Sequence, residues 1–321
     1  MENMKVFYNS DYGLSPESYE TTRKAASVKD YILKQGDAID VVDPNTVINK
    51  KSVVKTVKQI HDPEYIKALE TGVNKKWLHE SSGFTWGERT FDFAVAHSHG
   101  IVAAVDTVID GPNTRSGSLS SGLHHARPDT GAGLCTINGL AVGAMHTISR
   151  NRPVMILDFD AHCGGGTYAH IINMERSGFA KAGDIIQIDA SVDRFDKYLP
   201  SGQHDLNLMD LLGEPRPDTE YLRGINKSLA IAESLYRDGM IVFYNAGIDP
   251  VNIVGFSNPY KAMSDREKAV SDWIGNKPAV FTLAGGYKWG GWTLDQLVEI
   301  HYDNILQWAE YCKSGNKAKV K

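Results

Sequence analysis

Cysteine is scarce in this chain of 321 residues, and its three copies exclude two structural classes. Cys135, Cys163 and Cys312 are too few and too scattered for a disulfide scaffold, and no pair has the Cys-x-x-Cys spacing of a structural zinc site. Because this usage suits a reducing compartment, we expect a cytoplasmic protein.

Long apolar runs and an excess of basic charge are missing as well. No uncharged apolar stretch approaches the length of a membrane span, and the opening MENMKVFYNSDYG lacks the basic and apolar regions of a secretory signal. The net charge of −5 leaves no basic footprint, so we expect no membrane partner and no direct nucleic-acid binding. Small neutral or cationic substrates suit this charge better. The sequence does not indicate an oligomeric state.

Short apolar runs are what the chain has instead. Each is followed by a glycine-rich or polar turn and then by helical spacing: KVFY, PVMILDFD, GDIIQID, MIVFYNAGID and PAVFTLAGG. Continuous hydrophobicity is typical of parallel strands that helices cover on both faces. Segments 89–109, 139–149 and 218–239 have the spacing of crossover helices, whereas 111–122 is predicted to be a polar loop.

No repeat or low-complexity linker divides the chain. We therefore predict a single α/β domain over residues 1–321, with a central parallel sheet covered by helices on both faces. A solvated tail is expected from about residue 313 to residue 321.

Charged side chains stand at the predicted ends of two strands, which is where open parallel sheets bind ligands. Asp158, Asp160 and His162 alternate at the end of one apolar run, so their side chains should point to one side. Buried charges need a compensating partner, and a metal ion is the obvious candidate. Asp249 closes another run.

Three further residues occupy comparable positions. The tandem pair His124 and His125 follows a glycine-rich loop, and Tyr287 follows two glycines after a strand. Taken singly, each has an ordinary interpretation as polar surface or a packed turn, and Asp249 alone would be a helix cap. Their coincidence with the Asp-x-Asp-x-His run favours a metallohydrolase.

Four segments together resemble the signature segments of the zinc-dependent histone deacetylase family, which includes acetylpolyamine amidohydrolases. They occur in the family's order: GLHHARPDTGAGLCTINGLAVGA, LDFDAHCGGGT, NAGIDP and LAGGY. The resemblance implies the three-layer arginase/deacetylase fold. It also implies hydrolysis of an acylated amine, so an acyl-lysine, an acetylated polyamine or a related small amine is the expected substrate.

The resemblance implies two ions. Asp160, His162 and Asp249 would hold Zn²⁺ with open positions for water and the amide oxygen. Two carboxylates and one imidazole make a hard ligand set, which Fe²⁺ or Co²⁺ would also suit. A structural K⁺ is implied near Asp158, Asp160, His162 and Asp189, although many relatives have serine in place of Asp189.

Four residues would carry out the chemistry in the family pattern. His125 would act as the general base and then as the acid for the leaving amine, while His124 assists electrostatically. Asp158 would hydrogen-bond His124. Tyr287 would donate its hydroxyl to the oxyanion, a contribution of about 3 kcal/mol.

Two positions depart from the family pattern. Gly133, Leu134, Gly285 and Gly286 would line the substrate channel, and Leu134 replaces a phenylalanine that narrows it in many lysine deacetylases. We therefore expect a wider channel that accepts a longer acyl group or a different amine. Gly165 stands where relatives have an Asp or Asn that braces the second tandem histidine.

The glycine at residue 165 leaves two alternatives for His125. Either another group orients this histidine, or its pKa is lower than usual because a carboxylate partner is lost. We expect activity to survive with a shifted pH optimum.

Two other interpretations of the whole protein stay open. An arginase-like ureohydrolase shares the fold, but it needs more ligands to bridge two Mn²⁺ ions than this segment supplies. A catalytically weakened protein that binds acylated ligands is favoured by Gly165 and Leu134. The retention of Tyr287 and of all three metal ligands argues against it.

Overall fold

A parallel sheet forms the centre of the computed structural model, which describes residues 2–13, 24–36, 39–73, 75–199, 204–205 and 218–315. The sheet has eight strands, and each strand pair in it is parallel. From one edge to the other, the strands are β2 (Ile39–Val42), β1 (Met4–Phe7), β3 (Arg115–Ser121), β8 (Ala279–Ala284), β7 (Ile241–Gly247), β4 (Val154–Asp158), β5 (Ile185–Asp189) and β6 (His204–Asp205).

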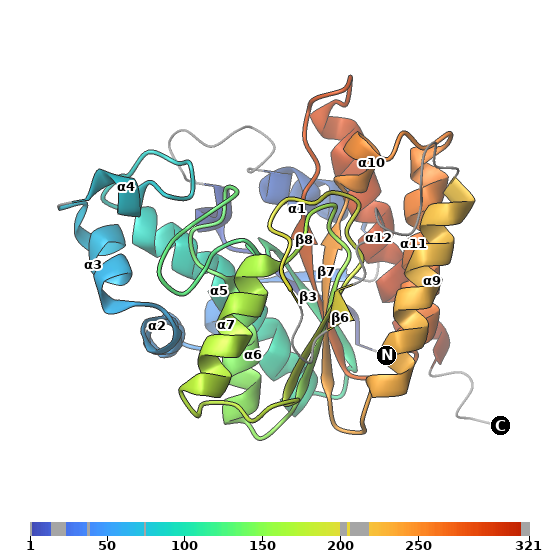
Figure 1. Ribbon diagram of the computed structural model, residues 1–321. Coiled ribbons are helices and arrows are strands. Elements are labelled where there is room, and N and C mark those ends of the chain that lie inside the picture. Colours follow the sequence, from blue (N-terminus) through green and yellow to red (C-terminus); the bar gives the residue numbers. More distant parts are fainter. Residues whose placement is uncertain are drawn as a thin grey trace.

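Helices cover both faces of this sheet, so the fold has three layers (Figure 1). One apolar core includes side chains of α2 (Lys50–Ile60), α3 (Pro63–Thr71), α5 (Thr90–Asp110), α6 (Gly139–Ser149) and α7 (Gly165–Arg176). The other includes side chains of α1 (Lys24–Gln35), α9 (Asp218–Leu235), α10 (Pro250–Ile253), α11 (Pro259–Ile274) and α12 (Leu294–Gly315). The short elements η1 (Ser10–Gly13), η3 (Pro44–Thr46) and α4 (Lys76–His79) complete the description. The predicted fold class is confirmed.

The apolar runs and the helical spacing predicted most of these elements. All five runs form strands, and the segments 89–109 and 139–149 correspond to α5 and α6. The third predicted helix, α9, ends at Leu235 rather than at residue 239. The helix α12 continues to Gly315, past the expected start of the tail, and residues 316–321 lie outside the described part. The single-domain assignment stays a prediction.

The predicted polar loop at 111–122 is wrong, because it contains the central strand β3. Its polar side chains are satisfied inside the sheet: the hydroxyl of Ser116 donates to the backbone oxygen of Lys5 at 2.8 Å. Gly117 leaves room for the ring of Phe281, which would lie 2.1 Å from a Cβ atom at residue 117. A polar composition therefore concealed a buried strand.

No helix among the described residues combines the length and the apolar character needed to cross a bilayer.

Candidate active site

Three neighbouring strands bring the predicted site residues to one edge of the sheet. Strand β7 pairs with β4 on one side and with β8 on the other, so the segments that follow these strands meet. Asp160 and His162 follow β4, Asp249 follows β7, and Tyr287 follows β8. Except for Asp249, these residues line one pocket, together with His124 and His125.

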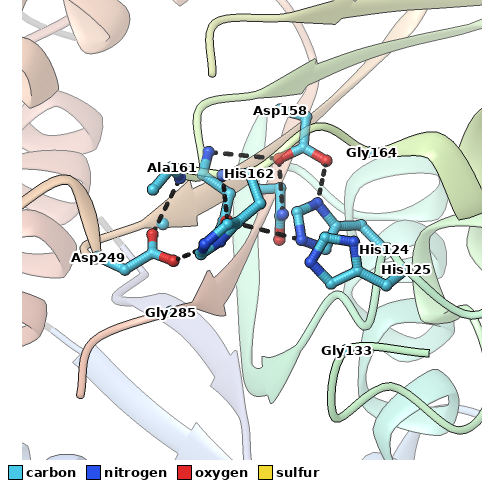
Figure 2. Close-up of polar contacts among 12 residues, drawn as sticks. His124, His125, Gly133, Asp158, Ala161, His162, Gly164, Asp249 and Gly285 are labelled. Carbon is cyan, nitrogen blue, oxygen red and sulfur yellow. Dashed lines mark hydrogen bonds and ion pairs between the residues drawn. The ribbon is translucent and has the colours of Figure 1, made fainter. Parts of the chain in front are cut away.

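The predicted metal ligands form a tight cluster at this pocket, which Asp160 and His162 line. One ligand atom from each of Asp160, His162 and Asp249 lies within 4.8 Å of the others. The Nδ1 atom of His162 is 3.2 Å from Oδ1 of Asp160 and 3.1 Å from Oδ2 of Asp249 (Figure 2). Both carboxylates are buried.

The charges of this cluster call for a cation. Oδ2 of Asp249 is buried without a hydrogen-bond partner, although His162 lies beside it. Burial raises the pKa of Asp249, and the neighbouring charge of Asp160 raises it further. A divalent metal would compensate both carboxylates and occupy the unsatisfied oxygen, so the residues present fit the metal centre that the sequence predicts.

His124 is held by a carboxylate from the end of β4. Its Nδ1 atom lies 2.7 Å from Oδ2 of Asp158, the pairing that the sequence predicts, and its Nε2 atom is 3.6 Å from Oδ1 of Asp160 (Figure 2). Burial disfavours the charged imidazole, but the charges of Asp158 and then Asp160 outweigh this effect and raise the pKa of His124 to about 10. His124 is therefore suited to remain positively charged.

His125 lies against His124 but has the opposite electrostatic character. The two ring centroids are 4.0 Å apart. Burial, followed by the charge of His124, lowers the pKa of His125 to about 4. Neighbouring groups whose pKa values are pushed apart in this way are typical of acid–base pairs.

The sequence analysis did not find the partner of His125, which is Asp196. Oδ2 of Asp196 lies 3.0 Å from Nδ1 of His125, and the carboxylate also pairs with the guanidinium of Arg127. The structure thus supports the first alternative above, that another group orients this histidine. The glycine at residue 165 indicated that a different residue would have to hold His125, but nothing in the sequence identified that residue as Asp196.

Tyr287 lies at the pocket with its backbone fixed. Its N–H donates to Oδ1 of Asn252 at 3.1 Å, and its carbonyl accepts from Nδ2 of the same residue at 2.9 Å. The phenol ring stacks on Trp289 at a centroid distance of 4.6 Å. Burial raises the pKa of Tyr287, so the hydroxyl keeps its proton and can donate it in a hydrogen bond.

The predicted channel residues are placed with one exception. Gly133, Leu134 and Gly285 line the pocket. Gly286 is outside the pocket lining, and a Cβ atom there would meet the side chain of Ile248 at 2.7 Å. The channel role of Gly286 therefore has no support in the geometry of the pocket.

Lys24 is a further pocket residue that the sequence analysis missed. Its amine donates to the backbone carbonyl of Gly285. Burial lowers the pKa of Lys24 to about 8, although the charges of Asp249 and Asp160 oppose this. This lysine places a cationic group close to the metal ligands.

The proposed monovalent cation site remains a prediction. The carboxylate of Asp189 accepts from the backbone N–H of Gly164 and from Nε2 of Gln187, each at 2.8 Å. Oδ1 of Asp158 accepts from Nδ2 of Asn245 at 2.8 Å. Protein N–H groups thus already stabilise part of the negative charge on Asp158 and Asp189 that a K⁺ ion would otherwise compensate.

Comparison with known proteins agrees with this geometry. The Histone deacetylase domain family matches residues 18–180, about half of the chain. The acetoin utilization protein AcuC of Staphylococcus aureus is 30% identical over 118 residues, which cover 34% of this chain and 30% of that protein. A "Probable deacetylase" of Archaeoglobus fulgidus is 26% identical over 169 residues, 50% of this chain and 45% of the relative.

These matches span 30% and 45% of the length of the two relatives, whereas the structural match is nearly complete. The solved structure of an acetylpolyamine aminohydrolase from Burkholderia pseudomallei superposes with a TM-score of 0.73 at 18% identity, covering 95% of this chain and 98% of that one. This similarity shows the arginase/deacetylase fold. With its family match over residues 18–180, the chain belongs to the histone deacetylase domain family.

Proposed function

We propose that this protein is a zinc-dependent amidohydrolase that removes the acyl group from an acyl-lysine, an acetylated polyamine or a related small amine. The observation that carries the proposal is the placement of His124, His125 and Tyr287 around the cluster of Asp160, His162 and Asp249. Family membership supports a deacetylase-like hydrolase. The name of the structural match supports an acetylated polyamine as substrate, whereas the acyl-lysine class comes from the resemblance of the sequence to histone deacetylases.

Asp160, His162 and Asp249 are the proposed metal ligands. When bound, Zn²⁺ would polarise the scissile carbonyl and make water more acidic, and Fe²⁺ or Co²⁺ would suit the same ligands. A K⁺ ion near Asp158 and Asp189 is part of the proposal as a structural ion. Cys135 and Cys163 form no disulfide among the described residues, which agrees with the cytoplasmic location that we propose.

The two tandem histidines have different roles in the proposed reaction. Because Nδ1 of His125 faces Asp196, its Nε2 atom is available to take a proton from the attacking water and to return it to the leaving amine. His124 is held in its charged form beside Asp158 and stabilises the negative charge that develops on the substrate. Tyr287 donates a hydrogen bond to the carbonyl oxygen as it becomes negative, worth about 3 kcal/mol.

The two alternative functions are less well supported by the geometry. An arginase-like binuclear centre needs ligands for a second metal, and among the described residues one cluster of suitable ligands occurs. The argument for an inactive binding protein rested on Gly165 and Leu134. Asp196 weakens it, because His125 has a carboxylate partner despite the glycine.

A substrate panel tests the proposal. The Zn²⁺-loaded protein is offered acetyl-lysine peptides, acetylated polyamines and longer acyl-lysines, beside the variants Tyr287→Phe and His125→Ala. We expect turnover on one class and a loss of about 10²- to 10³-fold in each variant, with the metal content and thermal unfolding unchanged. Absence of turnover on every class by the folded, metal-loaded protein would contradict the proposal and favour the binding protein.

A further inference from the structure

The glycine at residue 165 and the aspartate at residue 196 occupy one space. A Cβ atom at Gly165 would lie 2.3 Å from the backbone oxygen of Asp196 and 2.5 Å from its Oδ1. Any side chain at residue 165 would therefore displace Asp196. The carboxylate of Asp196 fits beside His125 because Gly165, which replaces the Asp or Asn of many relatives, has no side chain.

The backbone around Asp196 is arranged to deliver this carboxylate. Asp196 has a left-handed conformation with φ of 58°, which non-glycine residues adopt infrequently and aspartate tolerates better than most. The preceding residue, Phe195, accepts a hydrogen bond at 3.1 Å from the backbone N–H of Cys163, next to the glycine run. Its ring packs edge-on against His125 at 4.9 Å between centroids.

The carboxylate has donors on both of its oxygens, and its side chain is only 5% exposed. Oδ2 accepts from Nδ1 of His125 and from the backbone N–H of Gly166, each at 3.0 Å. Gly166 belongs to the first turn of α7, where free backbone N–H groups favour an anion. Oδ1 pairs with Arg127.

These contacts fix the proton on His125. An ionised carboxylate can only accept, so the atom facing it, Nδ1 of His125, has to be the protonated nitrogen. In the neutral ring this leaves Nε2 with a lone pair. The partner thereby selects the tautomer and the orientation of the ring at once.

We propose that Asp196, anchored by Arg127 and Gly166, is the positioning residue that holds His125 as the Nδ1–H tautomer, in place of a side chain at residue 165. The catalytic consequence rests on the proposed function of His125. The tautomer itself does not, because it can be observed without any substrate.

The chain contains a matched control for this interaction. On α5 and α6, Asp106 accepts from Nε2 of His146 at 2.7 Å and from the guanidinium of Arg150 at 2.9 Å. This cluster has the same three residue types as His125, Asp196 and Arg127, and it lies outside the pocket lining. Asp106→Asn therefore removes a comparable carboxylate with no link to His125.

The first experiment is spectroscopic. Imidazole ¹⁵N spectra of the Zn²⁺-loaded protein, with the His125 signals assigned by their loss in His125→Ala, should show the proton on Nδ1. In Asp196→Asn we expect this state to be lost or mixed with the Nε2–H tautomer, and in Asp106→Asn we expect it unchanged. A wild-type proton on Nε2, or an identical His125 spectrum in Asp196→Gly, which leaves no side-chain acceptor at this position, would overturn the proposal.

The second experiment measures turnover in the same proteins. We expect Asp196→Asn to lower kcat about 10- to 100-fold with KM within about twofold, and Arg127→Gln to have a smaller effect in the same direction. A wild type whose turnover depends on His125 but not on Asp196 would refute the positioning role. A wild type without turnover whose tautomer nevertheless changes in Asp196→Asn would refute the proposed function and leave Asp196 as the group that sets the tautomer.

Discussion

The two tandem histidines are chemically identical and adjacent, yet different kinds of structure hold them. His124 pairs with Asp158, the last residue of β4, whereas His125 pairs with Asp196, in a loop after β5. The pKa of His124 is raised to about 10 and that of His125 is lowered to about 4. Neighbouring carboxylates raise the first pKa, whereas burial and the charge of His124 lower the second, so the surroundings rather than the residue type separate the two pKa values.

The strand side of the pocket, around His124 and Asp158, is tied into the sheet by hydrogen bonds between side chains of neighbouring strands. Oδ1 of Asp158 accepts from Asn245 at 2.8 Å, and the hydroxyl of Thr282 donates to Asn245 at 2.9 Å. This chain of hydrogen bonds crosses β4, β7 and β8. The loop side depends on Asp196 and the ion pair with Arg127, whose side chain is 39% exposed. We therefore expect substitutions on the strand side to have the larger effects.

The variant Asp158→Asn removes the carboxylate that holds His124 on the strand side, and we expect it to have the largest effect on kcat. The asparagine retains the size of the side chain but removes the charge that keeps His124 protonated, so we expect kcat to fall by on the order of 10³-fold. The free energy of unfolding should also fall, by about 3 kcal/mol, because His124 loses its buried partner. Steady-state kinetics and urea unfolding measure the two effects.

Asp106→Asn, which removes a carboxylate from the distant His146, is the control for Asp158→Asn. It should leave kcat within about twofold of the wild type. A kcat for Asp158→Asn within tenfold of the wild-type value would show that His124 works without its carboxylate.

The variant Gly165→Asp tests the loop side and should have an intermediate effect. It restores the family's usual side chain, but the new atoms collide with Asp196, so we expect a loss of about 1–3 kcal/mol in the free energy of unfolding and a lower kcat. The sequence alone predicted only a changed pH optimum. Thermal unfolding and kinetics of the single variant measure the collision.

A double variant separates the two causes of the loss in Gly165→Asp, which are the collision with Asp196 and the presence of a second carboxylate. The double variant Gly165→Asp/Asp196→Gly removes the competing carboxylate but leaves the backbone oxygen of residue 196 beside the new Cβ atom, so it should recover only part of the lost kcat. Gly165→Ala should show the collision without a second carboxylate. If Gly165→Asp alone were as stable and as active as the wild type, residues 165 and 196 would not exclude each other.

The strand side could be predicted from the sequence because its key residues lie close together in the chain or directly after apolar runs. Asp158, Asp160 and His162 lie on one buried strand and its continuation, and the period of two places them on one side. Asp249 and Tyr287 follow two other apolar runs, and parallel strands end at the same edge. The metal cluster therefore follows from hydrophobic patterning and from the resemblance to a family.

The loop side could not be predicted, because its contacts depend on tertiary structure. Asp196 is 71 residues from His125 and belongs to no regular element, so no spacing rule connects the two. Strand β3 was missed for a related reason. Ser116 and Ser118 donate their hydroxyls to backbone oxygens of β1, and Ser120 donates to the hydroxyl of Ser118. This compensation is not visible in a composition.

The variant Leu134→Phe should have the smallest effect on catalysis and the clearest effect on specificity. Leu134 lies on the loop side, after Gly133, and lines the pocket. A phenylalanine should narrow the channel, so we expect kcat/KM for acetyl substrates to change less than about threefold and that for longer acyl chains to fall about tenfold or more. Competition between acetyl and longer acyl-lysine peptides measures the ratio directly, with thermal unfolding as the control for packing. Equal losses on both substrates would mean that residue 134 supports the pocket without selecting the acyl group, and the selective wall would then have to lie elsewhere among the pocket residues.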